Sequence, residues 1–415
     1  MIGRLPIALL MIVGAAAQSG QRDRYFTRYP FEKWKTENAR PAIKWTEHIL
    51  PARLSAHQRL VTRFEIGLDT HEIEKRRGRG DIIVLIEIQD ALGRQWRTHQ
   101  TFDLRRIPKD GKANGFVFSL ESFIVPGDYQ VWMAVCDSAT LEHGMKQKRL
   151  HVAPLRSDPL PEAWRDLPAV EFVRAFETPE AWFQPYVRGR LHLPLPTSRP
   201  VHIQVVMNMT PSERVSGSIR VFRRNMSVLV PALKVLAGIE PPKGSVDVTL
   251  LDLTRRRTWE QRRVRSLDWM RMREPFADAN PGVVDVQSLA AKAEMRQFFW
   301  DQVLERARVD ERDDSLRVLI VLSAPVFLEH QIAVEPSRLP KNPNRRVFYL
   351  CYRPLSAYRP PVQASDGPTV PIATAMASDD LEHTLKPLDA RVFSAATPEQ
   401  VRKAIATMFA EIARM

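Results

Sequence analysis

The spacing of the hydrophobic residues changes part-way along this chain of 415 residues. Between residues 51 and 153, hydrophobic residues alternate with polar ones, a period that is typical of β-strands with one buried face. Beyond residue 199, compact apolar runs alternate with stretches of helical period, as they do in α/β proteins. The sequence therefore predicts two domains of different class.

The first of these domains has several short strands and no helical period between them. Residues 60–68 show the strand pattern most clearly, because Leu60, Phe64, Ile66 and Leu68 fall on one face. Turn residues such as Gly127 separate the runs. Six or seven such strands within about a hundred residues predict an antiparallel β-sandwich of immunoglobulin-like (Ig-like) size over residues 51–153.

Two segments of different texture flank this domain. Residues 18–50 are rich in aromatic and charged residues without a sustained period, so we interpret them as a lead-in segment that packs across a domain. Residues 154–198 contain eight prolines, which favour a semi-rigid connector. One short helix is expected within the connector, over residues 161–176.

The second domain is expected to span residues 199–415. Residues 317–323 form a continuous apolar run, which predicts a central strand covered on both faces. A final helix is predicted from Thr397, because Thr397-Pro398-Glu399-Gln400 has the spacing of a capping box. The remaining expected strands are 202–207, 246–253, 259–267, 346–352 and 390–395, and the expected helices are 219–237, 286–308 and 379–385. This order predicts a doubly wound α/β domain, in which ligands bind at the carboxyl ends of the strands.

The first strand of this domain runs into Asn208, Thr210 and Ser212, which form an N-x-T-x-S pattern. Here the second half resembles a von Willebrand factor A (VWA) domain, in which D-x-S-x-S holds a divalent cation that an acidic group of the partner completes. The resemblance covers residues 199–415 and rests more on the order of the elements than on the motif. As a whole, the chain resembles the secreted VWA-related proteins of acidobacteria.

The resemblance implies a divalent cation such as Mg²⁺ at Asn208, Thr210 and Ser212. Asn208, however, replaces the leading Asp and removes a full negative charge from a site where a hard cation prefers carboxylate oxygens. The central strand ends in Ser323, which offers a hydroxyl where the family usually offers another Asp. We therefore expect a degenerate site without a cofactor, in which these side chains satisfy backbone groups. A bound cation is the alternative left open.

The first seventeen residues have the features of a secretory signal peptide. Arg4 precedes an apolar run over residues 5–13, and Ala15 and Ala17 flank an A-x-A cleavage site. We expect a secreted or periplasmic protein with no membrane span after signal cleavage, because no later apolar stretch has spanning length. Export argues against a nucleic-acid partner for the formal net charge of +13.

Basic residues gather in two clusters, both expected at hairpin tips or strand edges, where charge discourages aggregation. The first is Lys75-Arg76-Arg77 with Arg79. The second begins with Arg255, Arg256 and Arg257 and continues to Arg262, Arg263 and Arg265. An anionic envelope polymer is the alternative ligand for these clusters.

From these features we expect a non-catalytic module that binds a protein partner. Its partner surface would comprise the side chains Asn208, Thr210, Ser212, Ser323, Arg255, Arg256 and Arg257. The alternative from another class is a hydrolase with Ser323 as nucleophile and His330 or His383 as base, although the chain has no nucleophile elbow, P-loop or H-E-x-x-H motif. The two cysteines, Cys136 and Cys351, fall in different domains, so no disulfide is expected.

Overall fold

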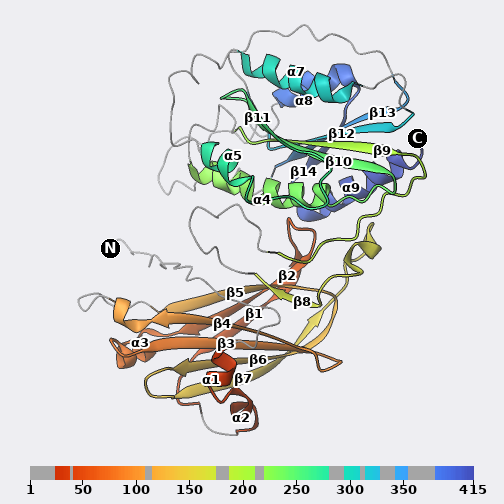
Figure 1. Cartoon of the computed structure of the whole chain (residues 1–415). Coiled ribbons are helices and arrows are strands. Elements are labelled where there is room, and N and C mark those ends of the chain that lie inside the picture. Colours follow the sequence, from red (N-terminus) through yellow and green to blue (C-terminus); the bar gives the residue numbers. More distant parts are fainter. Residues whose placement is uncertain are drawn as a thin grey trace, which may run out of the picture.

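The computed structural model describes residues 24–37, 41–107, 115–173, 187–210, 219–279, 294–308, 314–327, 342–353 and 379–415. In these residues the chain is of mixed α/β class and builds two four-stranded sheets and one six-stranded sheet (Figure 1). The predicted signal peptide lies outside the described residues.

The N-terminal half contains the two four-stranded sheets, in which all neighbouring strands are antiparallel. One sheet has the order β1-β2-β5-β8 and the other the order β4-β3-β6-β7. The strands are β1 (Thr46–Leu54), β2 (Leu60–Leu68), β3 (Asp81–Asp90), β4 (Gln95–Asp103), β5 (Phe116–Ile124), β6 (Gly127–Asp137), β7 (His143–Val152) and β8 (Val170–Phe172). A 3-10 helix, η1 (Leu104–Arg106), follows β4.

The two sheets share one hydrophobic core. Every second residue of β2 is buried, as predicted, because successive side chains of a strand point to opposite faces. Phe64 and Ile66 of the first sheet belong to the same buried cluster as Val84 and Val131 of the second. The alternating pattern of this half thus turns one face of each sheet toward the opposite sheet, where it is buried.

Two short helices from the predicted lead-in segment add a further layer. They are α1 (Arg24–Arg28) and α2 (Phe31–Thr36), and they lie beside β3 and β6 in Figure 1. Phe31 and Trp34 pack with Ile83 and Cys136, which face away from the shared core. This layer explains why β3 is buried on both faces over most of its length.

The prediction that Lys75-Arg76-Arg77 forms a hairpin tip is wrong. Lys75 and Arg76 end a helix, α3 (Thr70–Arg76), which begins at the N-cap Asp69. The Arg76 side chain is buried and forms ion pairs with Glu72, Asp137 and Glu142. Two of these acids follow in the sequence more than sixty residues later, so the cluster is neutralised by partners that the local pattern does not reveal.

The predicted helix over residues 161–176 is also wrong. In its described residues up to 173, the connector forms the 3-10 turn η2 (Pro161–Trp164) and then strand β8, which pairs with β5 at the edge of the first sheet. Pro161 begins the turn, and the β-branched Val170 suits an extended strand better than a helix. Part of the connector therefore belongs to the N-terminal sheets.

The C-terminal half contains a six-stranded sheet of order β11-β10-β9-β12-β13-β14. All neighbouring strands are parallel except β11, which runs antiparallel to β10. The strands are β9 (Val201–Asn208), β10 (Gly244–Asp252), β11 (Arg257–Gln261), β12 (Leu316–Ser323), β13 (Arg345–Tyr352) and β14 (Arg391–Ala395). The predicted strands are confirmed, although β11 is shorter than predicted and begins earlier.

Helices cover both faces of this sheet (Figure 1). One face carries α4 (Ile219–Ala237), α5 (Arg273–Asp278) and α9 (Pro398–Ile412), and the other carries α7 (Met295–Ala307), α8 (Asp380–Leu385) and the 3-10 turn η7 (Lys386–Leu388). In β12, Val318 and Ile320 face the first layer, whereas Leu319 and Val321 face the second. The prediction of a central strand covered on both faces is therefore confirmed.

The helix predictions for this half hold in most places. The capping box at Thr397 is present in α9, where Thr397 and Gln400 bond to each other's backbone N–H groups. Helix α7 begins at Met295, and residues 286–293 of the predicted helix lie outside the described residues. No helix among the described residues is both long and apolar enough to span a membrane.

The two halves meet where α9 packs against the connector and the β1–β2 turn. The buried Arg402 of α9 binds both carboxylate oxygens of Asp158, at 2.5 and 2.8 Å, and donates to the Leu160 carbonyl at 2.6 Å. Its guanidinium carbon lies 4.7 Å from the centre of the Trp164 ring. The Gln58 amide donates to the Pro398 carbonyl at 3.0 Å. We call this set of contacts the Arg402 joint.

Candidate functional site

The ends of β9 and β12 bring two predicted site residues together. These strands are parallel neighbours, so their carboxyl ends lie at the same edge of the sheet. The Asn208 side-chain nitrogen donates to the Ser323 hydroxyl at 3.0 Å. Both side chains are buried, at 1% and 0% exposure. The pair therefore lies beneath the surface at the strand ends.

Thr210 completes a polar cluster whose groups are satisfied internally. Its backbone N–H donates to the Asn208 side-chain oxygen at 2.9 Å, and its hydroxyl accepts from the Leu253 N–H at 2.6 Å. The Ser323 hydroxyl in turn donates to the Ala324 carbonyl at 2.5 Å. Ser212, the third residue of the predicted motif, lies outside the described residues.

The described residues of this cluster do not fit a hard divalent cation. Asn208 and Thr210 are neutral, and the Asn208 oxygen already accepts a backbone N–H, whereas Mg²⁺ and Ca²⁺ prefer carboxylate oxygens. Over the part of the chain that the structure describes, no group of three or more His, Cys, Asp or Glu side chains could hold a metal ion. The cluster instead ties the ends of β9, β10 and β12 together.

A buried carboxylate that the sequence reasoning did not single out lies on the face of the sheet that α7 and α8 cover. Asp379 caps α8 by accepting the Leu381 N–H at 3.1 Å, and it also accepts from the Val326 N–H and the Tyr349 hydroxyl. Burial raises the pKa of Asp379, although these hydrogen bonds oppose the shift. The signal that could have found it is its place as the first residue of the predicted helix over 379–385, since Asp is a preferred N-cap.

Cys351 lies beside this carboxylate, with its sulfur 3.5 Å from Asp379. Burial, together with the charge of Asp379, raises the pKa of Cys351 to about 12. The thiol therefore stays protonated at neutral pH and is not a ready nucleophile. Cys136 is also free and buried, and burial raises its pKa to about 12.

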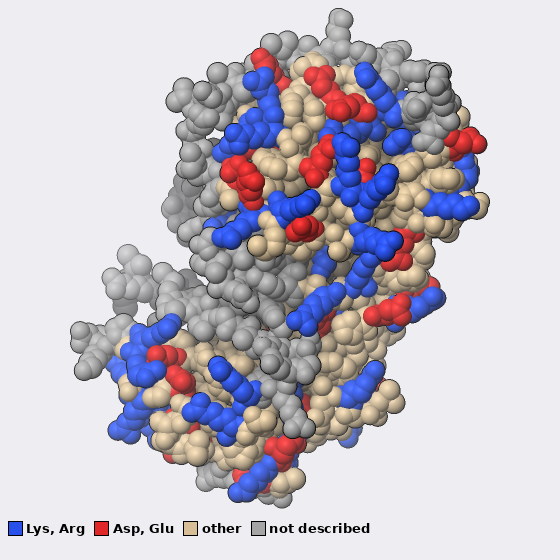
Figure 2. All heavy atoms as spheres, in the orientation of Figure 1, with Lys and Arg blue, Asp and Glu red and all other residues tan. Residues whose placement is uncertain are grey.

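The predicted partner residues Arg255, Arg256 and Arg257 lie at the turn from β10 to β11, near the polar cluster. Each of them forms an ion pair: Arg255 with Asp252 at 2.8 Å, Arg256 with Glu294, and Arg257 with Asp278 at 3.2 Å. Figure 2 shows the same interspersion of basic and acidic side chains over the visible face of the C-terminal half. The three arginines are therefore neutralised locally and are no concentrated positive patch.

A groove with more basic than acidic residues lies along β10 and β11. It has a volume of about 460 Å³ and its acidic residues are Asp247, Glu260 and Glu305. The basic residues that line it are His202, Arg262, Arg263, Arg306, Arg308 and Arg317. We call it the basic groove. Sequence reasoning named Arg262 and Arg263 but missed the arginines of α7 and β12, because only the strand order places them on the same side.

The described residues provide no base for Ser323. Its hydroxyl is buried and engaged with Asn208 and Ala324. His383 is exposed on α8, and His330 lies outside the described residues. In the described part of the chain, Ser323 thus lacks both the imidazole partner and the access to solvent that a nucleophile requires.

Comparisons with known proteins give distant matches only. No family model matches the chain, and no curated protein matches it either. Among solved structures, a Northeast Structural Genomics Consortium target, SoR45, shares 11% identity over 28% of this chain and 95% of its own, with a TM-score of 0.17. The β-glucuronidase of Parabacteroides merdae shares 9% identity over 85% of this chain, also with a TM-score of 0.17.

A further match is a calcium-binding mutant of β-glucuronidase 2 from Bacteroides uniformis, with 9% identity over 68% of this chain and a TM-score of 0.17. The chain spans 40% and 33% of the lengths of these two glucuronidases. At such TM-scores the likenesses carry no argument about function, and the site has to be judged from its own residues.

Proposed function

We propose that this chain is a secreted or periplasmic, non-catalytic protein-interaction module that combines an Ig-like β-sandwich with a VWA-like α/β domain. The observation that carries the proposal is the polar cluster at the strand ends. Where a VWA domain has a carboxylate for a cation, Asn208 instead bonds to Ser323 and Thr210. Partner binding at this edge of the sheet is then independent of metal.

The strand order supports the VWA-like assignment. The first strand of the half, β9, lies at the centre, and the sheet switches direction there between β10 and β12. Only the edge strand β11 is antiparallel, which agrees with the early hairpin expected from the sequence. Two antiparallel sheets around one core support the Ig-like assignment in the same way.

Metal independence is the property to test. Calorimetric titration of the full chain with Mg²⁺, Mn²⁺ and Ca²⁺ is expected to show no saturable heat, because the described cluster offers neutral, already bonded oxygens. Capture of a partner from the protein's own envelope fraction is expected to survive EDTA, and charge reversal at Arg255 and Arg257 is expected to weaken it.

The matched control is Arg149→Glu, which changes an exposed arginine on β7, outside the proposed surface. Tight cation binding that disappears in both Asn208→Ala and Ser212→Ala would contradict the degenerate site. Loss of capture in EDTA would contradict metal-independent recognition. If the charge reversal at Arg255 and Arg257 weakened capture no more than Arg149→Glu does, the β10–β11 turn would be excluded from the surface.

The basic groove favours a second candidate function, binding of an anionic envelope polymer. Arg262→Ser combined with Arg263→Ser is expected to lower the salt concentration that elutes the protein from heparin, because each lost phosphate- or sulfate-like contact reduces counter-ion release. Removal of charge at Arg255 to Arg257 is expected to have a smaller effect, since all three side chains are paired with acids. In the groove variant, Arg262 pairs with Glu260 at 3.2 Å, but Arg263 forms no ion pair among the described residues. The reverse ranking would rule out the groove as the binding surface.

A further inference from the structure

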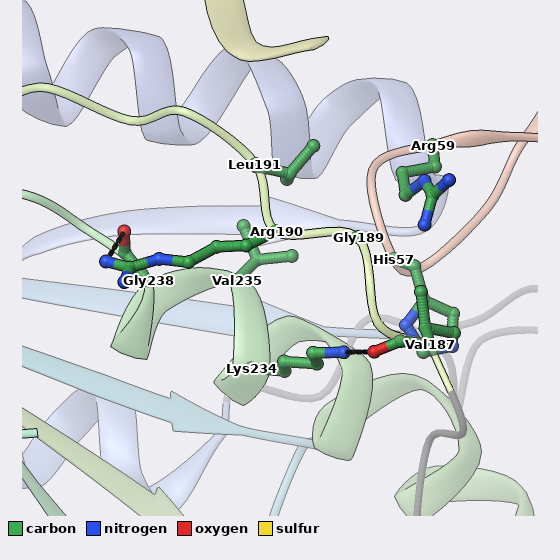
Figure 3. A pocket seen from close by; sticks show the side chains of 9 residues that line it. All are labelled: His57, Arg59, Val187, Gly189, Arg190, Leu191, Lys234, Val235 and Gly238. Atoms are coloured by element: carbon green, nitrogen blue, oxygen red, sulfur yellow. Dashed lines mark hydrogen bonds between the residues drawn. The ribbon is translucent and has the colours of Figure 1, made fainter. Parts of the chain in front are cut away.

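A small cavity lies between the two halves. Its walls come from the β1–β2 turn, from the connector and from α4, and it has a volume of about 30 Å³ (Figure 3). A cavity needs roughly 10–15 Å³ to hold one water molecule, so this one has room for a single water-sized guest. An organic ligand would not fit.

The wall carries more positive than negative charge. Arg59, with a side chain only 3% exposed, pairs with Glu171 at 2.5 Å. Lys234 of α4 donates to the Val187 carbonyl but forms no ion pair in the described part of the chain, so Glu171 alone is left to balance both cations. Arg190, which also lines the cavity, has its own partner in Glu240 at 3.3 Å. Among the described residues, one positive charge is thus left without a counter-charge, which is costly away from water.

Hydrogen bonding at the wall is also incomplete. The Nη2 atom of Arg59 is buried and has no hydrogen-bond partner among the described residues. His57 is neutral, since burial and the charges of Lys234 and Arg59 lower its pKa to about 3, and a neutral imidazole keeps one N–H to donate. Burial lowers the pKa of Lys234 to about 8, as expected for an ammonium without its own counter-ion.

We propose that this cavity binds a small inorganic anion, chloride in ordinary solution, held by Arg59, Lys234 and His57. The anion supplies the missing negative charge and an acceptor for the Arg59 guanidinium. Its donors come from both halves of the chain, so it binds only while the halves are docked. By linkage, the bound anion stabilises the docked arrangement.

Thermal unfolding of the full chain tests the proposal. At equal ionic strength, sodium chloride and sodium bromide are expected to raise the wild-type midpoint by about 2–5 °C over sodium gluconate, the size expected for one bound ligand. Lys234→Met is expected to abolish this difference, because it removes the surplus charge. Lys243→Met, at an exposed lysine outside the cavity wall, is the matched control and keeps the difference. Equal midpoints of the wild type in chloride and gluconate would overturn the proposal.

A second measurement needs no variant to fold. In wild-type crystals grown in bromide, an anomalous peak is expected in the cavity between His57, Arg59 and Lys234. A water molecule or an empty cavity there, with bromide confined to the outer surface, refutes the proposal. Both measurements are independent of the partner-binding function.

Discussion

Replacing Arg402 by methionine is expected to lower the free energy of unfolding by about 3 to 5 kcal/mol, the range seen when one partner of a buried ion pair is removed. The variant leaves the Asp158 carboxylate without its two-point partner and removes one of the two donors to the Leu160 carbonyl, which still accepts the Ala163 N–H. Methionine retains the apolar stem of the side chain, although it loses the contact between the guanidinium and the Trp164 ring. The loss therefore reports on the charge pair more than on packing.

Urea denaturation followed by tryptophan fluorescence measures this effect. The matched control is Lys403→Met, since Lys403 is the next residue of α9 and is exposed. An Arg402→Met variant as stable as this control would show that the Arg402 joint contributes little.

The ion pair between Arg402 and Asp158 is also expected to make the free energy of unfolding depend on pH. Although burial acts to raise it, the pKa of Asp158 is lowered by its hydrogen bond with Arg402. A carboxyl with a lowered folded-state pKa stabilises the protein above its unfolded pKa, and this stabilisation is lost as the pH falls through the folded value. The difference in stability between the wild type and Arg402→Met should therefore shrink in acid.

Replacing Gly244 by alanine is expected to destabilise the six-stranded sheet by about 3 kcal/mol or more. Gly244 has a φ of 116°, and a Cβ at this position would lie 2.0 Å from the Val201 carbonyl oxygen. Left-handed backbone costs a non-glycine residue about 1–2 kcal/mol, and overpacking typically adds about 1–3 kcal/mol. The clash involves backbone, and it falls at the pairing of β10 with β9, so it cannot be relieved by a change of rotamer.

Gly78→Ala separates the two causes. Gly78 also has a positive φ, of 74°, but a Cβ there meets nothing within 4 Å. In urea denaturation, the free energy of unfolding of Gly78→Ala is expected to fall by about 1 kcal/mol, the cost of left-handed backbone alone. Comparable losses in the two variants would show that the contact with Val201 yields easily.

The sequence predicts those features that depend on neighbouring residues. The alternation in residues 60–68, the continuous apolar run of β12 and the capping box at Thr397 are all local, and all are confirmed. The sequence also predicts that Asn208 and Ser323 lie at one edge of the sheet, because the carboxyl ends of parallel strands meet there. Their direct hydrogen bond lets the polar groups of the cluster satisfy one another. It depends on side-chain positions that no spacing rule predicts.

Two features that the sequence did not reveal share a physical cause, which is pairing between distant residues. Arg76 belonged to a cluster predicted at an exposed tip, yet Asp137 and Glu142 neutralise it from another part of the first half. Arg402 was not singled out from the sequence, and its partner Asp158 lies 244 positions earlier. A long basic side chain can be buried where a carboxylate pairs with it. A single sequence does not reveal such distant partners.

The wide separation of the contacts in the Arg402 joint has a consequence for the order of folding. Gln58 and Pro398, which bond across the joint, are 340 positions apart. During synthesis from the N-terminus, the β1–β2 turn is complete long before α9 exists, so Asp158 and Gln58 stay hydrated while the six-stranded sheet assembles. Closing such long loops is entropically costly and slow. We therefore expect the two halves to fold as separate units and to dock late, as domains of larger proteins generally do.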